Sequence, residues 1–75
     1  MNRCNDWQTS LKYANEDLEP TGFSILMVEP EEGSFDCQVW KDDEFLETYA
    51  GNYYEDELCA LIEDAVAYIK RELIK

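Results

Sequence analysis

The side chains able to carry chemistry in this chain are carboxylates and three cysteines, because the sequence contains no histidine. Without histidine, a Ser–His or Cys–His nucleophilic pair cannot form within the chain, and the commonest metal ligand is missing. Cys4, Cys37 and Cys59 are scattered and show neither the CxxC spacing of redox sites nor the paired spacing of zinc sites. The composition therefore predicts a protein that is not an enzyme and has no cofactor or metal centre.

Adjacent carboxylates occur at Asp42–Asp43 and at Glu63–Asp64. Two carboxylates act as a catalytic pair only where a pocket drives their pKa values apart. A chain of 75 residues has little interior from which to build such a pocket. The acids of segment 41–47 also lack the spacing and the central glycine of an EF-hand loop, so a solvated turn is expected there.

Charge is the exceptional property of the sequence, since 18 acids and 6 bases give a formal net charge of −12. All the acids except Asp6 and Glu72 lie between Tyr13 and Ile69, where Lys41 is the only base. Such a surface repels phosphates and anionic lipid headgroups, so direct binding to nucleic acid or to membranes is not expected. The expected partner is another protein, with a basic surface.

The sequence is expected to form one acidic domain over residues 1–75, with residues 1–4 frayed. No signal-peptide pattern follows Met1, and the longest aliphatic run, Ile25–Val28, is too short to span a bilayer. An odd number of cysteines without paired spacing indicates a reducing compartment, where thiols behave as small buried hydrophobic groups. A cytoplasmic location is therefore predicted.

Apolar spacing predicts two helices, over residues 6–18 and 52–73, with three strands between them. The second helix is expected to have Asn52 as its N-cap and Glu55 as the partner in a capping box. The strands, over residues 22–29, 34–40 and 44–51, are joined by connections too short for a parallel crossover. The predicted fold class is α+β, in the order α-β-β-β-α, with a three-stranded antiparallel meander and both helices packed on one face.

This element order is shared with double-stranded-RNA-binding domains, and the resemblance is one of topology. Those domains contact phosphates through basic residues at the start of the second helix and in a strand loop. The corresponding stretches here are NYYEDE, beginning at Asn52, and EPEEG, beginning at Glu29, and neither contains lysine or arginine. RNA binding is therefore not expected.

The alternation of the middle strand predicts an open sheet face. Phe35, Cys37 and Val39 fall on one face and are expected in the core, which leaves the residues between them on the other. Glu47 and Tyr49 of the third strand join that open face if Leu46, Thr48 and Ala50 point inward. The opposite register of the third strand remains an alternative, because Phe45 is also a candidate core residue. This candidate protein-binding patch comprises Asp36, Gln38, Trp40, Glu47 and Tyr49.

The second helix offers another candidate protein-binding surface, formed by Glu57, Glu63 and Asp64. Glu57 and Asp64 share a helix face with Glu63 at its margin, and no base lies four residues after any of the three. Solubility and helix-dipole matching explain much of this acidity. A surface that steers a basic partner and a surface that imitates nucleic acid are the two functional alternatives.

The sequence favours a non-catalytic protein-interaction module that uses an acidic surface. Its sharpest form is a compact inhibitor, of the kind that phages and other mobile elements encode, which mimics nucleic acid in the binding site of a basic protein. The alternative is an accessory subunit or oligomer component that associates through an apolar and aromatic patch on the open sheet face.

Overall fold

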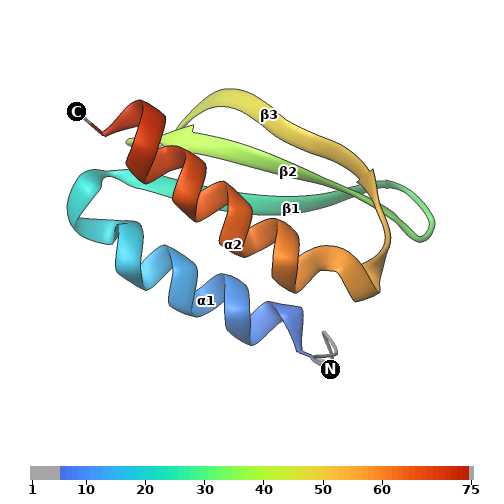
Figure 1. The fold of residues 1–75 in the computed structure, drawn as a ribbon. Helices are drawn as coiled ribbons and strands as arrows, with labels where there is room; N and C mark the ends of the chain where they lie inside the picture. The colour runs from blue at the N-terminus through green and yellow to red at the C-terminus, as the bar shows by residue number, and fades with distance from the viewer. Residues whose placement is uncertain (1–5, 75) are drawn as a thin grey trace.

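The computed structural model describes residues 6–74 and shows two helices packed against a three-stranded sheet (Figure 1). The expected fraying of residues 1–4 lies outside the described residues. The predicted order α-β-β-β-α is confirmed. The elements are α1 (Trp7–Leu18), the 3-10 turn η1 (Glu19–Thr21), β1 (Phe23–Glu31), β2 (Ser34–Lys41), β3 (Glu44–Tyr53), the 3-10 turn η2 (Glu55–Glu57), α2 (Leu58–Tyr68) and the π-helical end η3 (Ile69–Leu73).

The sheet is an antiparallel meander in the order β1-β2-β3, as predicted. Figure 1 shows α1 and α2 side by side over the same face of this sheet. Helix α1 contacts α2 and β1, whereas α2 also contacts β2 and β3. The two helices therefore cover one face of the sheet together and leave the opposite face open.

The core lies between the helices and the middle of the sheet. Phe35, Cys37 and Val39 are buried, which confirms the alternation predicted for β2. The apolar stripes of the two helices close over them. The other members of this cluster are Leu18, Phe23, Ile25, Leu58, Leu61, Ala65 and Ile69.

Side chains accept backbone N–H groups where α1 and η2 begin. Asp6 precedes α1, and its Oδ1 accepts from the N–H of Thr9 at 3.2 Å. The expected cap at Asn52 is wrong, because Asn52 still belongs to β3 and has a φ of 64°. Tyr54 precedes η2 instead, and its N–H donates to Oε1 of Glu57 at 3.0 Å, so Glu57 and not Glu55 is the partner in the capping box.

Strand β3 is irregular because it contains extra residues relative to β2. Trp40 lies opposite Phe45, yet its neighbour Val39 lies opposite Glu47, so Leu46 is an extra residue. Tyr49 is extra in the same way, because Gln38 lies opposite Thr48 and its neighbour Cys37 lies opposite Ala50. Such β-bulges bend a strand and change the face to which the following side chains point.

Gly22 ends η1 with a φ of 85°, a backbone conformation that favours glycine. A Cβ at this position would lie 2.5 Å from Oδ1 of Asp42 and 3.2 Å from Nζ of Lys41. We expect Gly22→Ala to destabilise the protein by more than the roughly 1–2 kcal/mol of the left-handed backbone alone, because Asp42 must also move. Thermal unfolding should show a decrease in Tm of about 4–8 °C for each kcal/mol.

Gly33 provides the matched control for that substitution. Its φ is 79°, but nothing lies within 4 Å of a Cβ built there. Gly33→Ala should therefore show the backbone cost without the steric cost, and its Tm should fall less. Equal decreases in Tm for the two variants would show that the Asp42 side chain moves aside freely.

Candidate protein-binding surfaces

The open sheet face is defined by the pairing of β1 with β2. Asp36, Gln38 and Trp40 alternate with the buried residues of β2, so their predicted position on this face is confirmed. Residues paired in register share a face, which brings part of β1 beside them. The paired residues are Ser24 with Trp40, Leu26 with Gln38, and Val28 with Asp36.

Trp40 and Phe45 meet on this open face. Their rings pack edge to face, with centroids 5.8 Å apart and planes inclined by 75°. The indole N–H of Trp40 donates to Oε1 of Gln38 at 3.1 Å, which satisfies the polar atom and holds the ring in one orientation. Phe45 and Leu26 remain 51% and 44% exposed. We call Leu26, Trp40 and Phe45 the open-face patch.

Glu47 and Tyr49 do not belong to this patch, and their predicted position on the open face is wrong. Tyr68 of α2 donates to Oε2 of Glu47 at 2.8 Å, and its ring centroid lies 4.9 Å from that of Tyr49. The reason is the two β-bulges, which interrupt the alternation of β3. Phe45 therefore faces outward with Trp40, while Glu47 and Tyr49 approach α2. The alternative register, which would place Phe45 in the core, is wrong as well, because Phe45 is exposed beside Trp40.

The hydrogen bond between Tyr68 and Glu47 makes the free energy of unfolding depend on pH in the alkaline range. Donation to the Glu47 carboxylate raises the pKa of Tyr68, and burial and the charges of Glu47 and Glu72 raise it further. A group whose pKa is raised by folding contributes stability below its unfolded pKa, about 10 for tyrosine. That contribution is lost as the pH rises through the folded pKa.

We therefore expect Tyr68→Phe to be less stable than the parent protein at neutral pH, by a difference that shrinks at strongly alkaline pH. Urea unfolding of the two proteins at neutral and alkaline pH measures this difference directly. Comparison of the two proteins cancels the titration of groups that they share. A difference that stayed constant above the pKa of free tyrosine would contradict the role assigned to the hydrogen bond.

Asp36 holds the bulged end of β3 on the open face. Its Oδ1 accepts from the backbone N–H of Asn52 at 3.1 Å. Gly51 allows this approach, because a Cβ there would lie only 2.7 Å from the same oxygen. The carboxylate of Asp36 is therefore engaged within the sheet, on the same face as the open-face patch.

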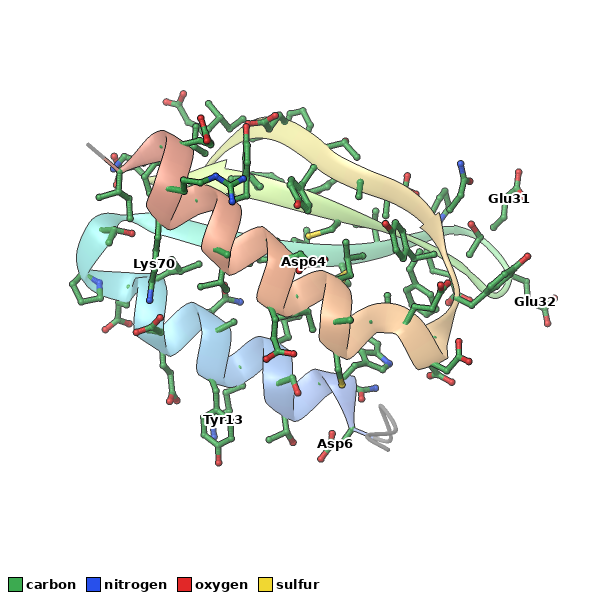
Figure 2. The ribbon with its side chains drawn as sticks, in the orientation of Figure 1. Asp6, Tyr13, Glu31, Glu32, Asp64 and Lys70 are labelled. Carbon is green, nitrogen blue, oxygen red and sulfur yellow. The ribbon has the colours of Figure 1, made fainter. Side chains whose placement is uncertain are left out.

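The three acids predicted as a surface of the second helix are separated in the structure. Glu57 is the last residue of η2, and its carboxylate accepts the N–H of Tyr54. Glu63 lines a shallow groove between α1 and α2, whereas Asp64 is exposed and does not line that groove (Figure 2). The outer side of α2 therefore offers two exposed carboxylates, Glu63 and Asp64, on different flanks.

The groove between the helices has a volume of about 870 Å³. Ala14, Ile62 and Val66 contribute an apolar part of its lining. Lys70 of η3 reaches across toward α1 and forms an ion pair with Asp17 (Figure 2). Both side chains are about half exposed, and pairs of this kind contribute roughly 1 kcal/mol or less.

Few of the carboxylates in the described part of the chain have a basic partner. Between residues 6 and 74, ion pairs join Lys70 to Asp17 and Arg71 to Glu72. Lys41 is engaged differently: its Nζ donates to the carbonyl of Thr21 at 2.6 Å and lies 4.3 Å from the centroid of the Phe23 ring. The acidic surface is therefore largely uncompensated. Figure 2 shows Glu31 and Glu32 extending from the hairpin between β1 and β2.

The cysteines are of two kinds. Cys37 is a free, fully buried thiol, and burial raises its pKa to about 12, so the expectation of an inert hydrophobic thiol is supported there. Cys59 is disulfide-bonded, so the expectation of a free thiol is wrong at this position. Cys4 lies outside the described residues. The disulfide removes one of the observations on which a reducing compartment was predicted.

Comparisons with known proteins do not assign this chain to a family. No protein family, curated protein or solved structure matches the chain significantly. In the described part of the chain, no helix has the length and apolar character required to cross a membrane. No group of three potential ligands among residues 6–74 is placed to hold a metal ion.

Proposed function

We propose that this protein is a non-catalytic interaction module that binds a basic partner protein. The observation that carries the proposal is the open-face patch, in which a half-buried Trp40 is held against the exposed ring of Phe45 on an otherwise acidic protein. Aromatic side chains held in place lose little conformational entropy on binding and are frequent centres of protein interfaces. The absence of histidine from the sequence supports a non-catalytic role.

The charge of the protein supports a basic partner. The 18 acids outnumber the 6 bases by 12, and the ion pairs among residues 6–74 involve only Asp17 and Glu72 of those acids, so the field around the protein attracts cationic surfaces. Such complementarity accelerates association and disfavours anionic competitors. In this proposal the acidic surface attracts the partner electrostatically, and Trp40 and Phe45 form the contact from which water is excluded.

The sharper form of the proposal is imitation of nucleic acid. Uncompensated carboxylates at Glu63 and Asp64 support it, because carboxylates can occupy positions where a basic site binds phosphates. Glu57 is exposed as well, although its carboxylate also accepts the backbone N–H of Tyr54. An inhibitor of this kind would compete with nucleic acid for its partner.

Capture from a lysate of the native host, with the whole protein as bait and washes of low and high salt, tests the proposal. A basic partner should bind at low salt and elute at high salt. The double variant Glu63→Lys/Asp64→Lys should weaken capture. The matched control is Glu31→Lys/Glu32→Lys, which makes the same change in charge at the β1–β2 hairpin.

The identity of the double variant that loses capture distinguishes long-range charge steering from a defined acidic binding surface. Weak capture by both double variants would indicate long-range steering by net charge, while loss confined to Glu63→Lys/Asp64→Lys would favour a defined acidic surface on α2. Displacement of the protein by added nucleic acid would support mimicry. Normal capture by both variants at low salt would overturn the role given to charge.

A second candidate function is an accessory subunit or oligomer component bound through the open-face patch. The exposed side chains of Leu26 and Phe45 beside Trp40 favour it, because association through this face would remove their apolar surface from water. Such a complex should persist at high salt, since screening does not weaken apolar contacts. Recovery of a salt-resistant partner, or of the protein itself, would favour this candidate.

A further inference from the structure

Asn15 of α1 pairs with the backbone of β1 as a neighbouring strand would. Its Nδ2 donates to the carbonyl of Ile25 at 3.0 Å, and its Oδ1 accepts from the N–H of Ile25 at 2.7 Å. One side-chain amide therefore satisfies both polar groups of one strand residue. This is the exchange that two directly opposed residues make in an antiparallel ladder.

These two hydrogen bonds lie on the free edge of the sheet. The N–H and C=O of a strand residue point to the same side, so Ile25 directs both away from β2. Phe23 is the next residue to point outward, and its N–H donates to Oγ1 of Thr21 at 3.1 Å. The side chains of Asn15 and Thr21 thus make hydrogen bonds with two successive edge-facing residues of β1, Ile25 and Phe23.

The segment that these side chains cover is suited to pairing with another strand. Residues 23–28 read FSILMV and contain neither a charge nor a proline, in a chain with a net charge of −12. Uncharged segments of about six residues with high β-propensity pair readily with copies of themselves when their edge is free. A cavity of about 380 Å³ lies beside the amide, at the Phe23 end of this edge, and is lined by Asn15, Phe23 and Ser24 and by the acids Glu19, Asp42 and Asp43.

We infer that Asn15 closes a β1 edge that would otherwise pair with a second copy of this chain. An antiparallel pair of β1 strands centred on Ile25 would place Phe23 of each copy opposite Met27 of the other, with no carboxylate in the central contact. A second copy fits this edge better than a basic partner does, because the segment offers no charge to complement. The side chain of Asn15 occupies the position that the incoming peptide group needs.

The test uses the full chain with Asn15→Ala, beside Gln8→Ala as a control at an exposed polar position of the same helix. Loss of two hydrogen bonds should accelerate exchange of the Ile25 amide about tenfold at low concentration. In sedimentation velocity, Asn15→Ala should move from monomer to dimer or larger species as concentration and salt rise, since salt screens the repulsion between acidic copies. The Ile25 amide should then regain protection, and the Met27 amide should become protected. Gln8→Ala and the parent protein should stay monomeric.

A folded Asn15→Ala protein that remained monomeric at every concentration and salt would overturn the inference. So would self-association that left the Ile25 and Met27 amides unprotected, because the contact would then lie elsewhere. If Asn15→Ala failed to fold, exchange in the parent protein would still decide: an Ile25 amide that exchanged as fast as an exposed one would show that Asn15 does not close the edge.

Discussion

Leu18→Ala is expected to remove most of the stability of this protein. Leu18 is fully buried in the core cluster at the end of α1. Replacing a buried leucine by alanine costs about 2–5 kcal/mol, through lost transfer energy and the cavity left behind. A domain of this size rarely has more than about 3–5 kcal/mol from a single core. Tm should therefore fall by more than about 10 °C in thermal unfolding followed by circular dichroism.

The same substitution at an exposed leucine is the control for this prediction. Leu46 is an extra residue of β3 and is 49% exposed, so Leu46→Ala leaves no closed cavity. Its effect should be within roughly 0.5 kcal/mol, as is usual for surface positions. A small effect of Leu18→Ala, similar to that of Leu46→Ala, would mean that α1 does not contribute to the core in the way described.

Trp40→Ala is expected to produce the largest loss of partner binding. In the proposed interface Trp40 is the central side chain, packed against Phe45 and held by Gln38. Truncation of such a residue typically costs about 2 kcal/mol or more, which corresponds to roughly a 30-fold weaker affinity. The fold should persist, because Trp40 lies outside the core cluster. Titration of the captured partner against both proteins measures the change in Kd.

Tyr13→Ala distinguishes this effect from a general requirement for exposed aromatic side chains. Tyr13 is 63% exposed on α1, in the helical layer that covers the other face of the sheet (Figure 2). Its replacement should leave Kd unchanged. Unaltered binding by Trp40→Ala would remove the open-face patch from the proposed function and leave the acidic surface as the remaining candidate.

Secondary structure and fold class were predictable from local pattern. The 3.6-residue spacing of apolar side chains marks both helices, and the strict alternation in β2 identifies Phe35, Cys37 and Val39 as core residues. Connections of a few residues then allow only antiparallel strands, which limits the topology to a meander. The position of Asp36, Gln38 and Trp40 on the open face follows from the same alternation.

The sequence by itself thus determined the elements, their order, the core of β2 and the acidic character of the surface, because each depends on local spacing or on composition. Tertiary structure alone decided the side of β3 to which Glu47 and Tyr49 belong, since the positions of β-bulges depend on which packing against α2 is best. It also decided the pairing of Asn15 with Ile25. That contact joins two elements through a side-chain amide, and no local pattern in the sequence records which residue across the fold will lie opposite it.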